Sequence, residues 1–351
     1  MASIYDPQPE DVLVDADRLR SLCKRLYQQV GLSLEDATAV ADIQVWTDLR
    51  GVCSHGTRLL PGYVRALQEG RYNPGANVAV LREGRAYLVL DGDHGIGHPV
   101  ARKGMELAIE KARQNGVGVV GIANSAHFGA ASAYSTIAAE QGMIGFITSN
   151  SGGPALVPYG GREPATANNP LSWAVPADPE PPVVLDMACA VAAGNRVKTL
   201  QLYGRPLPDG WMVTKDGRPA RDWSEAAYML PAAGPKGYGT ALVMSALGLL
   251  SGGLMPLRKT GAFAQEQFLM ALDINAFGDR AQFLAEMARC VRDIRAIPPA
   301  EGFDRVYLPG EIEWLRSQRW RQTGIPLHRD HVAVLEHTAA GLGVPVPWSQ
   351  T

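Results

Sequence analysis

The feature that most constrains the fold is an alternation of apolar, strand-like runs and amphipathic, helix-like segments in the middle of the chain. Short apolar runs are typical of buried strands, and apolar residues spaced three and four apart are typical of helices. Strands are predicted at 86–91, 117–123, 144–149, 183–185 and 268–274, and helices at 100–114, 130–141, 233–250 and 280–295. This alternation indicates an α/β domain.

Helical patterns dominate both ends of the chain. In the first 70 or so residues, Ser33 is predicted to cap one helix, and Ser54 a second that runs to Gly70. The last 40 or so residues are predicted to be helical, with breaks at 309–310 and near Gly324. The expected division is a helical domain made from residues 8–75 and 278–351 and an α/β domain made from residues 76–277.

Composition and charge exclude several classes of protein. Hydrophobic residues make up 46% of the 351 residues and charged residues 19%, which is typical of a globular enzyme. The formal net charge of −2 gives no electrostatic reason to expect nucleic acid or an anionic membrane as partner. The sequence has neither a signal peptide pattern nor an apolar run of about 18 residues that predicts a membrane span. The four cysteines lie far apart without metal-like spacing, so a reduced, cytoplasmic protein is expected.

Two histidines in Gly- and Ser-rich settings are the leading candidates for chemistry. His55 lies in Ser54-His55-Gly56, and His127 lies in the segment 124–129, NSAHFG. Histidine exchanges protons near neutral pH, and catalytic groups tend to lie in loops beside regular elements. A lone histidine is more often structural, but further polar or Gly-rich motifs follow at 169–171, 186–188 and 234–239. Together these motifs favour an active site.

The chain lacks the motif of a Rossmann dinucleotide site, which needs GxGxxG directly after a strand. The nearest approach is DGDHGIGH at 91–98, where the last glycine of the pattern is missing, and no Walker A motif occurs. His94 and His98 have the i, i+4 spacing of a helical metal pair. Because glycines separate them and a proline follows, a polar turn is predicted instead, and no metal site is assigned. Any dinucleotide must therefore be held by another fold.

Seven short segments spread over most of the chain carry a family resemblance. They are DLRGVCSHGTRLLPGY (48–63), NSAHFGAAS (124–132), SNSGGPALVPYGGRE (149–163), NNPLSWAVP (168–176), VVLDMACAVAAGN (183–195), LPAAGPKGYG (230–239) and LPGE (308–311). In this order they resemble motifs of the malate/L-lactate dehydrogenase family of NAD(P)-dependent oxidoreductases, the second, non-Rossmann family of that name. That family includes ureidoglycolate, sulfolactate and diketogulonate reductases and cyclic imino-acid reductases. Each segment alone is a weak signal, whereas seven in the correct order are highly specific.

The resemblance implies a fold, an activity and an assembly. The fold is the family's own α/β arrangement: a non-Rossmann nucleotide-binding domain with a mixed, largely antiparallel sheet, plus a helical domain from the N- and C-terminal segments. The activity is hydride transfer between NAD or NADP and a small 2-hydroxy or 2-oxo acid, in a homodimer. The alternative is reduction of a cyclic imino acid of the piperideine- or pyrroline-2-carboxylate type. The Ala-Ala-Ser run at 130–132 favours 2-hydroxy acids, because the imino-acid reductases carry a more aromatic run there.

The resemblance also implies catalytic and substrate-binding residues. The family's proton donor to the substrate oxygen falls on His55, with Ser54 either orienting it or capping a helix. The second family histidine, the acid/base in some members, falls on His127; we favour His55 for proton transfer and His127 for orienting substrate or nicotinamide. Arg58 is the candidate for binding the substrate carboxylate, because the planar guanidinium suits that group. The family more often has its arginine one position later, where this chain has Leu59.

Arg50 is a second candidate for binding the substrate carboxylate, although a structural salt bridge suits it better. Other implied contacts involve the cofactor. Asn169 is expected to shape the pocket near the nicotinamide. Asp186, at a strand end, can accept ribose hydroxyls, and Lys236, among glycines, can neutralise a phosphate. The implied cofactor contacts are Ser151, Asp186, Met187, Ala188, Lys236, Gly310 and Glu311.

The chain departs from the family pattern beside two motifs. Ala167-Asn168 stands where Gly-Thr is usual, and Cys189-Ala190 where Thr-Ser is usual. With the displaced arginine, these departures motivate a hypothesis of another class, a dinucleotide-binding protein without turnover. The presence of both histidine segments argues against it, since a binding protein needs no proton-transfer groups. The substrate side chain and the choice between NAD and NADP stay open.

Overall fold

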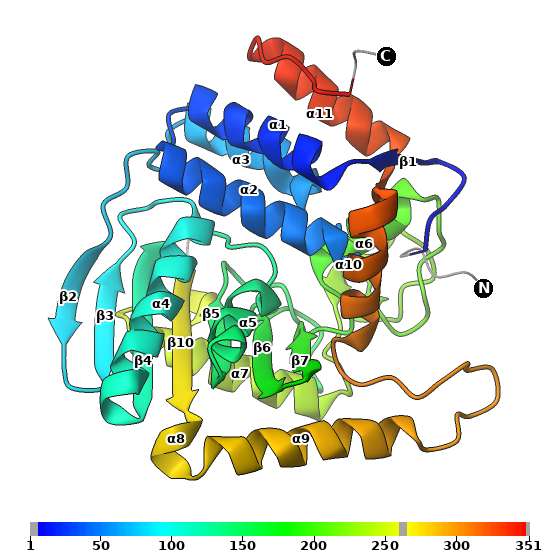
Figure 1. The fold of residues 1–351 in the computed structure, drawn as a ribbon. Helices are drawn as coiled ribbons and strands as arrows, with labels where there is room; N and C mark the ends of the chain where they lie inside the picture. The colour runs from blue at the N-terminus through cyan, green and yellow to red at the C-terminus, as the bar shows by residue number, and fades with distance from the viewer. Residues whose placement is uncertain (1–5, 260–264, 349–351) are drawn as a thin grey trace.

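A seven-stranded sheet forms the centre of the computed structural model, which describes residues 6–259 and 265–348 (Figure 1). The strand order is β2-β3-β4-β10-β5-β6-β7, and every neighbouring pair is antiparallel except β3 and β4, which run parallel. The strands are β2 (Ala79–Glu83), β3 (Tyr87–Asp91), β4 (Val117–Ser125), β5 (Met143–Asn150), β6 (Leu171–Ala177), β7 (Glu180–Met187) and β10 (Gln265–Asp273). Because a Rossmann sheet is mainly parallel, this order confirms the expected non-Rossmann α/β fold.

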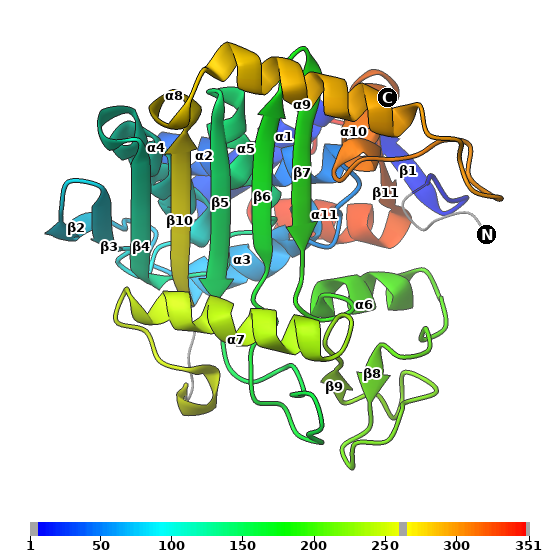
Figure 2. The same cartoon turned by 90° about the horizontal axis from the view of Figure 1, so that it is seen from below.

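Strand β10 lies in the middle of the sheet although it comes late in the chain. It pairs with β4 on one side and β5 on the other, and its Leu269 and Ala271 are fully buried. Helices α4 (Gly97–Asn115) and α5 (Ser132–Glu140) cover one face of the sheet, and α7 (Pro235–Leu249) covers the other (Figure 2). Covered on both faces, the inner strands β4, β5 and β10 contain continuous apolar runs, which is why the sequence predicted them. The inner strand β6 was not predicted.

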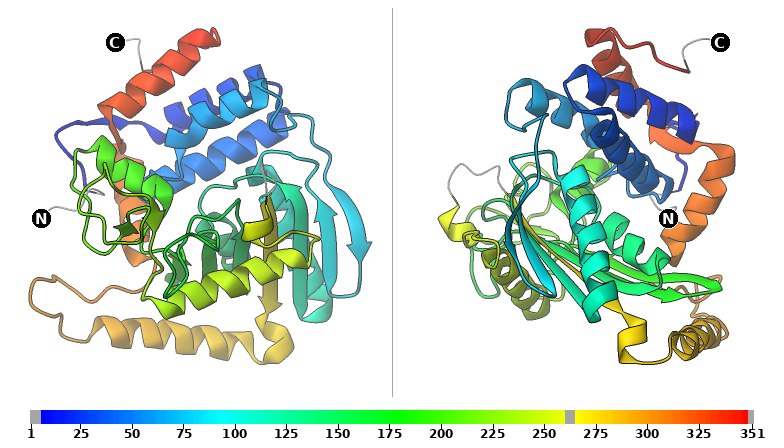
Figure 3. Two further views of the ribbon diagram at one scale, coloured as in Figure 1. Left: turned by 180° about the vertical axis from the view of Figure 1, so that it is seen from behind. Right: turned by 60° about the vertical axis from the view of Figure 1, so that its left-hand side comes forward.

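The two ends of the chain form a helical layer beside this sheet (Figure 3). Its helices share one buried core and are α1 (Ala16–Gln29), α2 (Leu34–Leu49), α3 (Leu60–Gln68), α10 (Glu311–Thr323) and α11 (Arg329–Gly341). The short strand β1 (Asp11–Val14) pairs with β11 (Ile325–His328) and so joins the two ends. The sequence predicted helix at both places and was wrong, because strands of four residues are defined by their pairing partner and leave little local pattern.

Helix α9 (Arg280–Arg295) runs across the strand ends of the sheet (Figure 2). Its Val291 is buried against Ala177 of β6 and Leu308. The division between domains at 277 and 278 stays a prediction. Among the described residues, no helix has the length and apolar character needed to span a bilayer. The remaining elements are α6 (Gly194–Leu202), β8 (Met212–Val213), β9 (Tyr228–Met229), α8 (Ile274–Phe277) and the 3-10 helices Thr57–Leu59 and Pro256–Arg258.

Candidate active site

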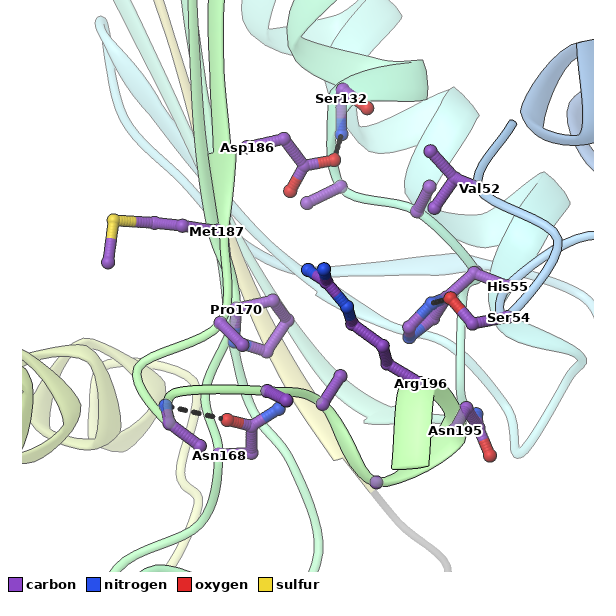
Figure 4. A pocket seen from close by; sticks show the side chains of 18 of the residues that line it. Val52, Ser54, His55, Ser132, Asn168, Pro170, Asp186, Met187, Asn195 and Arg196 are labelled. Carbon is purple, nitrogen blue, oxygen red and sulfur yellow. Dashed lines mark hydrogen bonds between the residues drawn. The ribbon is translucent and has the colours of Figure 1, made fainter. Parts of the chain in front are cut away.

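A cavity of about 690 Å³ lies between the helical layer and the sheet (Figure 4). Its walls are the turn after α2, the loop before α5, the end of β7 and the start of α6. The sequence-predicted site residues that line it are Ser54, His55, His127, Ser151, Asp186, Met187, Ala188 and Gly310. A second hollow of about 820 Å³, between the starts of α2 and α4, contains none of them. The fold therefore gathers most of the predicted site in one space.

The turn that carries His55 is held by Asp48 of α2. Thr57 donates both its backbone N–H and its hydroxyl to Asp48 Oδ2, at 2.9 and 2.6 Å. Gly56 packs directly against the same carboxyl group. Burial raises the pKa of Asp48 to about 7, and the two hydrogen bonds from Thr57 act in the opposite direction. A buried anchor thus fixes the backbone on which His55 sits.

Ser54 caps no helix, so that prediction was wrong. A 3-10 turn at Thr57–Leu59 comes first, and α3 begins only at Leu60, with Pro61 in its first turn. Proline is tolerated there because the N–H that it lacks would have no partner within the helix. Ser54 Oγ instead lies 2.9 Å from His55 Nδ1 and orients the imidazole.

The rings of His55 and His127 stack in the cavity wall, 5.7 Å apart and 19° from parallel. His127 Nδ1 lies 2.5 Å from the Tyr63 hydroxyl and accepts the backbone N–H of Gly129 at 3.3 Å. A ring nitrogen that accepts from a backbone N–H carries no proton, so His127 is protonated on Nε2. His55 is less restricted, since the Ser54 hydroxyl can either donate or accept.

Both histidines are neutral near neutral pH. Burial, with the nearby His127 and Arg58, lowers the pKa of His55 to about 3. Burial lowers the pKa of His127 to about 4. Burial also raises the pKa of Tyr63 well above its ordinary value, so its hydroxyl keeps the proton that it donates to His127. A neutral imidazole with a free acceptor nitrogen is suited to take a proton from a hydroxyl group.

A third histidine, His98, packs behind Tyr63. The two rings meet edge to face at 5.2 Å and 84°. Within the described part of the chain, neither nitrogen of the fully buried His98 ring has a hydrogen-bond partner. The turn predicted after the strand forms at Asp93 and His94, but His98 lies beyond it, because α4 begins at Gly97 and its first turn accommodates Pro99. His98 serves as a packing ring for the tyrosine.

The other side of the cavity is formed by Asp186, Met187 and Ala188 at the end of β7 (Figure 4). Ser132 N donates to Asp186 Oδ2 at 2.9 Å, so this oxygen accepts the first backbone N–H of α5. The other oxygen faces the cavity (Figure 4). Loss of surrounding water raises the pKa of Asp186. Gly310, also on this wall, has a φ of 80°, which favours glycine.

Four predicted contacts lie outside the lining of the cavity, and two of them, Arg58 and Lys236, are partly or fully exposed. Arg58 donates to Thr199 Oγ1 of α6 at 2.7 Å. Lys236 is exposed at the start of α7. Their predicted roles require either a ligand that extends beyond the cavity or a movement of these side chains.

Asn169 and Glu311, also predicted contacts, are buried in the framework of the site. Asn169 is fully buried; its Oδ1 accepts Ser151 N at 3.1 Å, and its Nδ2 donates to Ser245 Oγ at 2.6 Å. Glu311 Oε1 accepts from Arg295 Nε at 2.8 Å and also from Arg305. In the structure, both residues hold loops that line the cavity.

Sequence reasoning missed two residues at the site. Arg196, near the start of α6, lines the cavity; an arginine soon after the Asp-Met-Ala motif was the available signal. Tyr63 contacts His127; its spacing fits the buried face of a helix, and no local signal marks a polar role.

Comparisons with known proteins show the family to which the chain belongs. The sequence model of the family described as malate/L-lactate dehydrogenase matches residues 14–336. The chain is 34% identical to a malate dehydrogenase of Pyrococcus abyssi, over 95% of this chain and 96% of that protein. It is 33% identical to a ureidoglycolate dehydrogenase (NAD(+)) of Escherichia coli, over 90% of this chain and 93% of that protein.

Solved structures show the same fold. Malate dehydrogenase from Pyrococcus horikoshii aligns with a TM-score of 0.88 at 32% identity, covering 97% of this chain and 98% of that one. A Δ1-piperideine-2-carboxylate reductase from Pseudomonas syringae aligns with a TM-score of 0.84 at 26% identity, covering 93% of this chain and 100% of that one.

Proposed function

We propose that this chain, which belongs to the malate/L-lactate dehydrogenase family, transfers a hydride between a nicotinamide cofactor and a small 2-hydroxy or 2-oxo acid. The observation that carries the proposal is the stacked, neutral pair of His55 and His127 on the wall of a cavity that also contains Asp186 and Gly310. Proton-transfer groups and the expected dinucleotide contacts thus share one space, as reduction of a carbonyl by a bound cofactor requires.

We assign proton transfer to His55 and substrate orientation to His127. In oxidation, His55 accepts the hydroxyl proton at Nε2 while its Nδ1–H donates to Ser54 Oγ; in reduction it returns that proton. His127, whose Nδ1 accepts from Tyr63 and Gly129, presents Nε2–H to the substrate oxygen. That N–H can donate a hydrogen bond but leaves no lone pair to take a proton.

The residues of the cavity fit NAD or NADP. In the described part of the chain, Ser149 Oγ and Gln265 Oε1 are buried on the cavity wall without a hydrogen-bond partner, and a carboxamide can pair with both. Asp186 would accept a ribose hydroxyl. When bound, the nicotinamide supplies the hydride chemistry.

The test follows the absorbance of reduced nicotinamide, with NADH and NADPH, against a panel of 2-oxo acids and cyclic imines. We expect turnover with a 2-oxo acid, and the same panel identifies the cofactor. Turnover with cyclic imines alone would replace the proposal by its alternative. Cofactor binding without any turnover would favour a non-catalytic dinucleotide-binding protein.

The alternative, reduction of a cyclic imino acid, is supported by the likeness to the Δ1-piperideine-2-carboxylate reductase. A cyclic iminium ion already carries the proton that its product amine keeps. Reduction of a ketone instead creates an alkoxide that the protein must protonate. The paired histidines therefore favour the 2-oxo acid.

The pH dependence should differ between the two directions. Because the pKa of His55 is lowered to about 3, the imidazole stays unprotonated down to about pH 5, and kcat/KM for oxidation should stay level from about pH 8 to that point. Reduction needs the protonated imidazole, which becomes scarcer as pH rises. Its kcat/KM should therefore fall about tenfold for each unit that the pH is raised between about 5 and 8. An oxidation profile that declines below about pH 6.5, the ordinary histidine value, would contradict the assignment.

We propose that the protein is a homodimer joined through the outer face of α7. That helix packs on β5 and β10 with one side and exposes Leu242, Val243 and Leu249 on the other, with Leu250 directly after it. A charge-free apolar face of this kind is typical of an interface. Light scattering should give twice 37.6 kDa for the natural chain and 37.6 kDa for Val243→Glu. Val334→Glu, at a similarly exposed valine on α11, is the control that should stay dimeric.

We also propose a reducing, cytoplasmic location. All four cysteines are unpaired. Cys189 donates to Asn169 O at 3.0 Å, and burial raises the pKa of its thiol to about 12, which suits packing rather than reactivity.

A further inference from the structure

The carboxylate of a 2-oxo acid requires a cation, and neither residue at the expected position supplies one to the cavity. Arg58 is directed at Thr199 Oγ1, 2.7 Å away, and is absent from the cavity lining. Leu59, at the position where the family more often has arginine, is apolar and packs against the core of the helical layer. A carboxylate left without a partner in such a site would be costly. Another cation should therefore meet it.

The cations on the cavity wall are Arg50, Arg196, Lys198 and Arg316. Arg50 lies over the Trp46 ring at 4.6 Å and donates to Gly310 O at 3.4 Å. Arg316 forms an ion pair with Asp6 at 3.9 Å. Lys198 is exposed. The choice between these four cations therefore depends on where each side chain is directed.

Arg196 is placed differently. Figure 4 shows its side chain extending from the start of α6 across the cavity, with the guanidinium group between His55 and the end of β7 at Asp186 and Met187. Its Cζ also lies 5.5 Å from the ring centre of Trp211, a contact that limits the freedom of the side chain. A planar guanidinium in this place can hold a carboxylate with two parallel hydrogen bonds while the adjoining oxygen faces the histidines.

We propose that Arg196 binds the substrate carboxylate and that Arg58 positions it. The proposal rests on the proposed function and assigns the anchor to α6 instead of the turn after His55. Arg58 holds Thr199, whose hydroxyl also donates to Asn195 O at 2.9 Å, directly beside Arg196 in the chain. The displaced arginine of the family pattern thus fixes the helix that carries the new anchor. The substrate class is a short acid whose carboxylate adjoins the reacting carbon.

The test measures binding of oxamate, an unreactive isostere of a 2-oxo acid, to the full-length protein saturated with reduced cofactor. Calorimetry should show Kd for oxamate rising about 10²-fold in Arg196→Gln, the scale of a lost charge-assisted pair. Arg196→Lys keeps the charge but not the fork, so about a tenfold rise is expected. Cofactor Kd should change little in either variant. Lys198→Gln, a cation two residues along the same helix, should leave oxamate Kd within about threefold of the natural chain.

Turnover gives a second readout. The natural chain should prefer a 2-oxo acid over its neutral primary amide by about 10²-fold in kcat/KM, and Arg196→Gln should lose that preference. Unchanged oxamate binding in Arg196→Gln, or a loss of cofactor binding in place of oxamate binding, would overturn the assignment. If the natural chain reduces no 2-oxo acid, the proposed function fails, while the calorimetry still decides whether Arg196 holds a carboxylate. If Arg196→Gln does not fold, Arg196→Lys tests the same assignment through its smaller expected rise in the Kd for oxamate.

Discussion

Replacing His55 by alanine should lower kcat by at least about 10²-fold, the usual scale for a lost general acid or base. The expected cause is loss of the acceptor that Ser54 orients at 2.9 Å. Cofactor affinity should change little, because the implied dinucleotide contacts belong to other segments of the chain, the end of β7 and Gly310. Steady-state kinetics in both directions and a cofactor titration provide the measurement.

Variants of the neighbouring residues separate the two histidines. Tyr63→Phe should cost less than His55→Ala, because it removes only the hydroxyl that lies 2.5 Å from His127 Nδ1. If His127→Ala abolishes turnover while His55→Ala does not, the roles are reversed. A His55→Ala variant that also fails to bind cofactor would show that the turn supports the whole cavity.

Replacing Gly56 by alanine should destabilise the protein by about 3 kcal/mol or more and abolish activity. An alanine Cβ at this position would lie 1.8 Å from Asp48 Oδ1. Asp48 cannot swing aside without breaking the two hydrogen bonds that its Oδ2 accepts from Thr57. Equilibrium unfolding in urea measures the loss, and the same samples report activity.

Gly62→Ala is the matched control. Gly62 lies in α3, exposed, with no atom within 4 Å of the Cβ that alanine would add. Alanine should stabilise that helix by up to about 1 kcal/mol and leave activity unchanged. A Gly56→Ala protein as stable as the natural chain would mean that Asp48 does not pack against the turn as described.

The sequence determined the fold class because its evidence is local. A strand buried on both faces must be apolar along its whole length, and a packed helix must repeat its apolar residues every three or four positions. The pattern from 86 to 149 therefore predicted β3, α4, β4, α5 and β5. The absence of a Rossmann glycine motif and the ordered family segments predicted the largely antiparallel sheet. The motifs also named both histidines and Asp186, since these stand in short segments of unusual composition.

Side-chain direction and distant contacts were decided only by the tertiary structure. The sequence predicted that Ser54 caps a helix. In the structure, the hydrogen bond from Thr57 to Asp48 fixes a turn there, and Ser54 instead contacts His55 on the cavity wall. The joining of β1 to β11 depends on a partner more than 300 residues away. Arg58 and Arg196 cannot be told apart by residue type. Contact with Thr199 holds Arg58 against α6, whereas Arg196, at the start of that helix, lines the cavity. The sequence specifies which groups are present, and packing between distant segments decides which of them face a substrate.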